Sequence, residues 1–367
     1  MSDTTSVHLV VSSAESCSPW IPPELISRIL TMLWEAPQTP EERSALLKNI
    51  TLVNRTWLTL VALIVSRDVH ISDKENAYTF LRLLSKSSPR PKADDLFTTE
   101  KTRFANEACC SLTFHVDGKF SRSPSPITQD TFDTKLTPGS WPSPAHDASN
   151  AMSLILDMLS ALDYLPNLQH LSFRYTNWGY GDAFDHLELE TFPPQVTRLS
   201  IDYSFTLRSE FLCSMLLLWM KTRDRDRAYA PRGPRAPVRI PNLRHLSLSG
   251  VWTAFAIAIL QLCPNIETLE IRLTGDTAVQ LDELAPLSPT LRTLVLRHPG
   301  VALSRRRMMW LQSNLLTALE EGLFPEGSTK PRIVVRWGTS DPDVFTALMR
   351  ACTRFNTELV YDSRQPL

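Results

Sequence analysis

Apolar residues recur at three- and four-residue spacing in three successive segments between residues 20 and 67. The first segment opens at Pro22-Pro23, where two prolines fix φ and favour a first helical turn. The second opens at Thr39-Pro40-Glu41-Glu42, which combines a capping Thr with a Glu three residues later. The pattern predicts three helices, with apolar positions at Leu25, Ile26, Ile29, Leu30 and Leu33, then Leu46, Leu47, Ile50, Leu52 and Val53, then the run 58–65.

Three helices in about 45 residues bury too little surface for comfortable independent stability, so we expect exposed apolar area there to meet a partner. Residues 1–19 are rich in Ser and Thr and show no periodicity, and we expect them to be disordered. The predicted helical domain therefore spans residues 20–67.

A different pattern, with an apolar period of two, repeats later in the chain. Five strings read apolar-x-x-apolar-x-apolar, and they begin at Leu168, Val196, Leu243, Ile266 and Leu291. The last two steps, of 23 and 25 residues, fall within the period of leucine-rich repeats. In such repeats the last two apolar positions face a solenoid core and the residues between them point outward.

Shorter alternating strings predict further strands at 68–72, 111–115, 332–336 and 358–361. Amphipathic segments between strands predict helices. The expected fold class is α/β, an N-terminal three-helix module followed by a leucine-rich-repeat solenoid at 68–367 with parallel strands and convex helices. A doubly wound α/β domain is the alternative, although its strands are usually continuous apolar runs. The predicted helices lie at 152–162, 207–220, 254–262, 278–284, 308–319 and 344–352, and the predicted insertions at 120–150 and 221–240.

Composition and charge narrow the function classes. The chain has 367 residues, of which 43% are hydrophobic and 21% charged, which is ordinary for a globular protein. A net charge of −1 gives no field that implies nucleic acid or a membrane, and no apolar run is long enough to span a bilayer. Six cysteines without a C-x-x-C pair suggest neither a disulfide framework nor a zinc site. We expect a soluble, intracellular protein, cytoplasmic and/or nuclear.

The sequence holds no recognisable catalytic constellation. It lacks a Gly-rich phosphate loop, an H-E-x-x-H string and a G-x-S-x-G string. His170 and His245 occupy the same outward position of two repeats. We therefore expect both to lie on the surface of one sheet and not to act as a base and its orienting partner. We therefore expect no enzyme activity, no catalytic residue, no cofactor and no metal.

The helical segment resembles an F-box. Ile21-Pro22-Pro23-Glu24 matches the family's Leu-Pro-x-Glu opening, and Val53, Arg55 and Trp57 match its Val-x-Arg-x-Trp string. The segment between Leu33 and Trp57 is longer than the family pattern, which predicts a loop at residues 34–39. The resemblance implies docking on the Skp adaptor of an SCF-type cullin-RING ubiquitin ligase through Ile21, Pro22, Leu25, Ile29, Val53 and Trp57.

The implied function is that of a substrate-recognition subunit, monomeric within its complex with the Skp adaptor and cullin, whose repeat domain binds a substrate protein. Such a subunit raises the effective concentration of the substrate near the ligase. Two alternatives remain open. The chain could be a protein-interaction scaffold without ligase association, or the three helices could simply cap the solenoid.

The outward strand positions predict three columns on one concave face, because the side-chain period of a strand is two. The third column contains Arg272, Arg297 and Arg336, and it predicts a basic stripe for an acidic or phosphorylated segment. An ordinary solvated polar face is the alternative. The expected substrate-binding residues are Arg174, Arg198, Arg272, Arg297, Arg336, His170 and His245.

Overall fold

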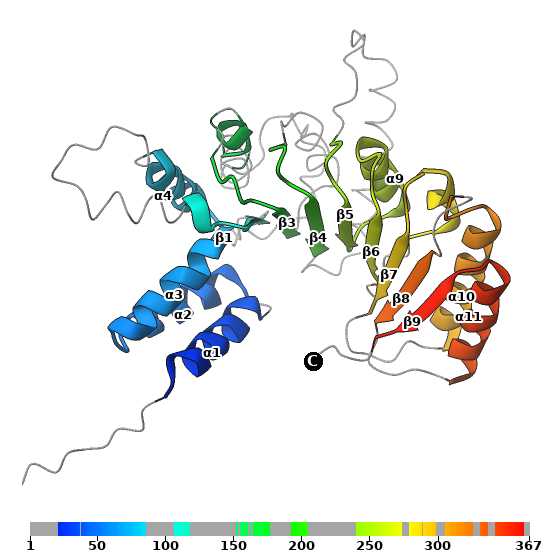
Figure 1. Cartoon of the computed structure of the whole chain (residues 1–367), viewed down its shortest axis with the longest axis horizontal. Helices are drawn as coiled ribbons and strands as arrows, with labels where there is room; N and C mark the ends of the chain where they lie inside the picture. The colour runs from blue at the N-terminus through cyan, green and yellow to red at the C-terminus, as the bar shows by residue number, and fades with distance from the viewer. Residues whose placement is uncertain are drawn as a thin grey trace, which may run out of the picture. The chain divides into compact units, whose positions relative to one another are not determined.

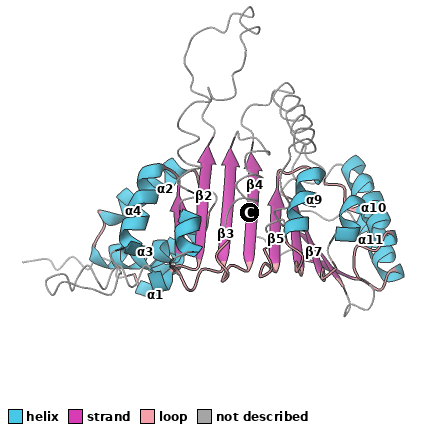
Figure 2. Cartoon of the chain, turned by 90° about the horizontal axis from the view of Figure 1, so that it is seen from above, coloured by secondary structure: helices cyan, strands magenta, loops and turns pink. Residues whose placement is uncertain are grey.

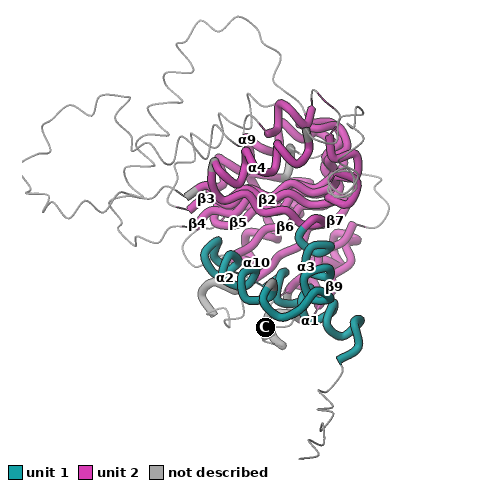
Figure 3. Tube along the Cα trace, turned by 90° about the vertical axis from the view of Figure 1, so that its left-hand side faces the viewer, with its two compact units in different colours: residues 1–65 teal, residues 66–367 magenta. Residues whose placement is uncertain are grey.

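A computed structural model of the chain divides it into two compact units, one ending at Val65 and one beginning at Ser66 (Figures 1 and 3). This division and the predicted domain boundary at residue 67 both fall in the last turn of one helix. The expected disordered N-terminus, the expected insertions apart from Ile240, and the expected helix at 207–220 lie outside the described residues. The structure describes residues 21–36, 38–85, 106–117, 152, 155–160, 162, 164–176, 192–204, 240–273, 279–287, 289–298, 305–325, 331–336 and 342–362.

The first unit consists of the helices α1 (Pro23–Glu35), α2 (Pro40–Thr51) and α3 (Arg55–Arg67), where the sequence predicts helices. A capping box starts α2, because the Glu42 backbone N–H donates to the Thr39 hydroxyl at 3.2 Å and the Thr39 N–H donates to the Glu42 carboxylate at 2.8 Å. Asn54 plays the capping part for α3 and accepts a hydrogen bond from the Trp57 N–H at 3.0 Å.

A small apolar core holds these helices together. Ile26, Leu30, Ile50 and Val61 are buried in it, and Trp57 packs against it. Because these side chains come from all three helices, the core explains why the helices pack as one unit.

Two details of the first unit differ from the prediction. Trp34 is part of α1 and 3% exposed, so the loop expected at 34–39 starts only at Ala36. The buried Arg43 explains this, because its guanidinium lies 4.6 Å from the centroid of the Trp34 ring and donates to the Trp34 carbonyl at 2.6 Å. Leu52 and Val53 are 83% and 53% exposed, since α2 ends at Thr51 and its apolar stripe does not continue through them.

The second unit is built on a nine-stranded sheet in which each strand pairs in parallel with the next strand of the chain. Figure 2 shows its strands as a row of arrows that point the same way. This sequential order confirms the predicted parallel stack, and it excludes a doubly wound sheet, whose strand order reverses at a switch point. The strands are β1 (Asp68–Ile71), β2 (Ser111–Asp117), β3 (His170–Thr176), β4 (Arg198–Ser204), β5 (His245–Ser249), β6 (Thr268–Arg272), β7 (Thr293–Arg297), β8 (Arg332–Arg336) and β9 (Glu358–Tyr361).

Helices connect the strands, as expected for a solenoid-like α/β fold (Figure 1). They are α4 (Lys74–Ser85), α9 (Thr253–Leu262), α10 (Arg305–Glu320) and α11 (Pro342–Arg354), and residues 155–160 are also helical. The α-helix expected at 278–284 is wrong, because the chain forms the 3₁₀ helix η2 (Asp282–Leu287) instead. The Leu281 N–H donates to the Asn314 side chain at 2.7 Å just before η2, and Pro286, which has no N–H, cannot donate to a helical ladder within it.

The core of the second unit runs along one face of the sheet. The core-facing positions of the strands are buried, among them Leu171, Leu246 and Leu294, each at most 1% exposed. Aromatic rings stack between neighbouring strands, with ring centroids 5.7 Å apart for Phe114 and Phe173. Since each repeat buries its leucines against the next, the core is continuous from β1 to β9.

Asparagine side chains connect successive repeats through hydrogen bonds. Each precedes a repeat strand and donates through Nδ2 to a backbone carbonyl of the preceding repeat. The pairs are Asn167 with Glu107 at 2.7 Å, Asn242 with Pro194 at 2.8 Å, and Asn265 with Pro241 at 2.8 Å.

Candidate functional site

Helix α1 has two apolar faces, and the fold buries only one of them. Ile26, Leu30 and Trp34, spaced four residues apart, are buried, with at most 5% of each side chain exposed. The second face stays exposed, at 51% for Leu25 and 45% for Ile29. We call this exposed set, together with Ile21 just before the helix, the α1 stripe; it consists of Ile21, Leu25, Ile29, Met32 and Leu33.

The six residues expected to bind an adaptor fall into different environments. Ile21, Leu25 and Ile29 belong to the α1 stripe, and Val53 is exposed between α2 and α3. Trp57 is partly buried against the helical core, and Pro22 is the N-cap residue of α1.

The sequence prediction missed Met32, the most exposed member of the α1 stripe at 66%. Its position seven residues after Leu25, two helical turns along the same face, was the available signal.

The second candidate surface is the side of the sheet that faces away from the leucine core, here called the polar face. The observed register pairs His170 with Arg198, Arg198 with His245, and Arg272 with Arg297, so the predicted columns are confirmed as rows across the strands. The first row is Asp68, Ser111, His170, Arg198, His245, Thr268, Thr293, Arg332 and Glu358; the second is His70, Thr113, Ser172, Ser200, Ser247, Glu270, Val295, Val334 and Val360; the third is His115, Arg174, Asp202, Ser249, Arg272, Arg297 and Arg336.

Part of the expected basic stripe is neutralised within the protein. Glu270 is shared by two arginines, at 3.6 Å from Arg297 and 3.7 Å from Arg336. Arg336 also bonds to Asp362 at 3.2 Å, and Arg332 to Glu358 at 3.4 Å.

The expected basic stripe at Arg272, Arg297 and Arg336 therefore has carboxylates of the chain beside its last two members, and its binding of a substrate stays a prediction. The predicted columns did not include Glu358 on β9 and Asp362 just after it, which lie beside Arg332 and Arg336. Burial, followed by the like charge of Arg272, lowers the pKa of Arg297.

Several residues that the columns predict to be outward are nevertheless buried. The pair between Glu270 on β6 and Arg336 on β8 spans β7, and Val295 of that strand is 5% exposed. Val334 is 8% exposed and Ser172 is 6% exposed. Hence the longer side chains of the first and third rows largely cover the side chains of the second row.

Three arginines of the polar face keep their charge available. Arg174, Arg198 and Arg272 form no ion pair with any residue that the structure describes. Arg198 is exposed, and the other two are half-buried. They are the positions where the face can accept an anion from outside.

His170 and His245 share a row but have different surroundings. His170 bridges three strands, because its Nε2 lies 2.8 Å from the Ser200 hydroxyl and its Nδ1 lies 3.3 Å from the Ser111 hydroxyl. Burial lowers the pKa of His170, which keeps its ring neutral near pH 7. The pKa of His245 is also lowered, first by burial and then by the charge of Arg198.

A hydrogen-bonded group lies at the other end of the polar face, near β1 and β2. His70 Nδ1 is 2.9 Å from His115 Nε2, and His70 Nε2 is 3.0 Å from the Asp68 carboxylate. The described residues contain no cluster of three or more ligands suited to a metal ion.

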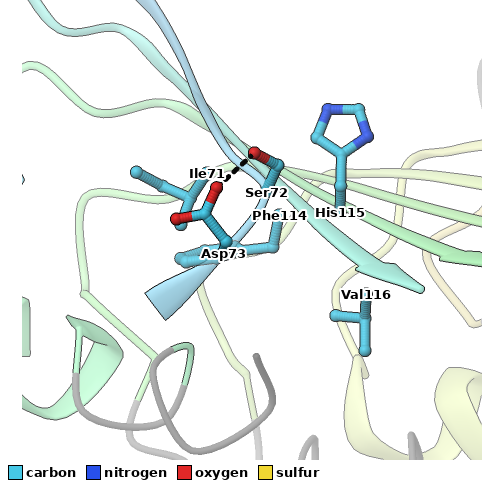
Figure 4. Close-up of a pocket in the computed structure, with 6 residues that line it drawn as sticks. All are labelled: Ile71, Ser72, Asp73, Phe114, His115 and Val116. Carbon is cyan, nitrogen blue, oxygen red and sulfur yellow. Dashed lines mark hydrogen bonds between the residues drawn. The ribbon is translucent and has the colours of Figure 1, made fainter. Parts of the chain in front are cut away.

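Beside this group, Figure 4 shows a small depression in which the Ser72 hydroxyl bonds to Asp73 at 3.1 Å. His115 and Val116 project from opposite sides of β2 there, as expected for successive strand residues.

Comparison with known proteins adds no identification. No family model matches the chain, and no curated protein matches it. Among the described residues, no helix combines the length and apolar character needed to cross a membrane. The function must therefore be inferred from the α1 stripe and the polar face.

Proposed function

We propose that this protein is the substrate-recognition subunit of an SCF-type cullin-RING ubiquitin ligase, acting in the cytoplasm and/or nucleus. In this proposal the first unit is an F-box that docks the Skp adaptor, and the second is a leucine-rich-repeat domain that binds the substrate protein. The chain contributes no catalytic residue; it brings the substrate close to the ligase.

The α1 stripe is the observation that carries the proposal. A helix that leaves Leu25, Ile29 and Met32 between 45% and 66% exposed on one face retains apolar area that its own fold does not use. Complete burial of such a side chain contributes about 1.5–3 kcal/mol, so covering half of each contributes about 1 kcal/mol per residue. The stripe can therefore supply several kcal/mol to docking, and it begins at Ile21, the first residue of the string that resembles the F-box opening.

The test is co-purification of the Skp adaptor and cullin with the full-length chain and with Leu25→Asp. Because Leu25 is half-exposed, the variant should still fold, whereas a charge buried without a partner in an apolar contact costs several kcal/mol and should abolish adaptor binding. Leu83→Asp is a matched control, since Leu83 is a comparably exposed leucine, 42%, on α4 of the other unit. Adaptor binding that survives Leu25→Asp, or that is lost equally in the control, would refute the docking surface.

A protein-interaction scaffold without ligase association is the second candidate. The observation in its favour is the connection from Leu33 to Trp57, which is longer than the F-box pattern. If the wild-type chain captures neither adaptor nor cullin while its polar face still binds a partner, the scaffold is the correct function.

A further inference from the structure

The arginines of the polar face fall into two groups, those with a carboxylate partner among the described residues and those without one. Arg297, Arg332 and Arg336 each contact a carboxylate of the chain itself. Arg198 and Arg272 contact none among the described residues, although the register places both on the face that carries the other arginines. A guanidinium without a carboxylate is a ready bidentate donor for an external anion.

The surroundings of Arg198 suit an anion with several acceptor oxygens. His245 pairs directly with Arg198 on the neighbouring strand, and Ser247 is the next outward residue of that strand. Together they offer a guanidinium, an imidazole and a hydroxyl, which suit the three terminal oxygens and the higher negative charge of a phosphate monoester better than the two oxygens of a carboxylate. Burial and then the charge of Arg198 lower the pKa of His245, so its ring is a neutral donor beside the guanidinium.

The second arginine lies at a definite separation from the first. From Arg198 to Arg272 the register moves two strands across and four residues along, which corresponds to a Cα separation of about 16 Å. An extended peptide covers that distance in about five residues. The straight path passes over Ser247, which has Ser200 beside it on one neighbouring strand and Glu270 beside it on the other.

We propose that the polar face binds a phosphorylated segment of a partner protein, with the phosphate at Arg198 and a second acidic group, about five residues away in sequence, at Arg272. Glu270, beside the path, disfavours acidic residues between the two groups through like-charge repulsion. This inference rests on the proposed function, because the segment belongs to the substrate that the receptor would recruit.

The experiment measures binding of fluorescein-labelled peptide pools to the full-length chain by fluorescence anisotropy. Each pool is degenerate except for phosphoserine and a glutamate five residues apart; matched pools replace phosphoserine by serine or shorten the spacing to two. The phosphorylated, five-residue pool should bind at least tenfold more tightly than either matched pool. Affinity should fall with added salt, because exposed charges are screened.

Variants of the chain separate the two groups of arginines. Arg198→Gln should weaken binding at least tenfold, and Arg272→Gln should abolish the preference for the five-residue spacing. Arg332→Gln is the matched control, because Arg332 is already paired with Glu358 at 3.4 Å, and it should change affinity less than twofold. Glu270→Gln should strengthen binding severalfold, because it removes a carboxylate beside the path.

Equal binding of the phosphorylated and unphosphorylated pools, or no binding of either, overturns the proposal. So does an Arg332→Gln effect as large as that of Arg198→Gln, or capture of RNA or phosphoinositide vesicles in preference to the peptides. Leu25→Asp should leave peptide binding unchanged, and Arg198→Gln should leave adaptor capture unchanged. Failure of the peptide proposal is thus distinguishable from failure of the ligase proposal.

Discussion

Replacing Gly250 by alanine should destabilise the second unit far more than the same change at Gly322. Gly250 follows the last residue of β5 with φ +66°, and a Cβ placed on it would lie 2.0 Å from the Tyr203 backbone oxygen. Gly322 has a similar φ of +84°, but a Cβ there would meet nothing within 4 Å. The two substitutions share the left-handed strain and differ in the clash.

The magnitudes follow from this difference. Alanine in the left-handed region costs about 1 kcal/mol, which is the whole effect expected for Gly322→Ala. Gly250→Ala also has to push β5 away from β4, because the clashing atom is backbone and cannot rotate aside. Overpacking of this kind adds about 1–3 kcal/mol, so the total loss should reach about 2–4 kcal/mol.

Urea unfolding followed by far-UV circular dichroism measures both variants against the parent. The urea midpoint should shift clearly more for Gly250→Ala. In thermal melts, Tm should fall by about 2–4 °C for each kcal/mol lost. Equal shifts for the two variants, or a larger one for Gly322→Ala, would show that Gly250 does not lie close against the Tyr203 backbone of β4.

Three further outcomes are expected. Asn265→Ala removes the bond to the Pro241 carbonyl at 2.8 Å and should lower the free energy of unfolding by about 1 kcal/mol in urea titrations. The pKa of His170 is lowered in the folded state, so the unfolded chain binds the proton first and stability should decline as pH falls below 6.5; His170→Gln should reduce that slope between pH 7 and 5 in thermal melts. Burial raises the pKa of Cys109 and Cys263 to about 12, so both thiols should resist iodoacetamide at pH 8 until the protein unfolds, and their contribution to stability should be complete below pH 9 and decline above it.

The sequence by itself determined the repeat register. In the L-x-x-L-x-L strings the leucines can be buried only if the intervening residues point outward, because strand side chains alternate between two faces. This is why the sequence alone assigns His170, Arg198 and His245 to one row, and Arg272 and Arg297 to another. Repeated apolar spacing also located α9, α10 and α11 within a few residues.

Only the tertiary structure decided which of these residues remain available to a partner. In sequence the α1 residues Leu25 and Ile26 are equivalent apolar neighbours, and packing against α2 and α3 buries one and leaves the other exposed. Arg272 and Arg336 look alike in their repeats, yet a carboxylate 66 positions away from Arg336, on β6, and another on the residue after β9 reach that guanidinium. Such pairings depend on strands brought together in space, and local spacing carries no information about them.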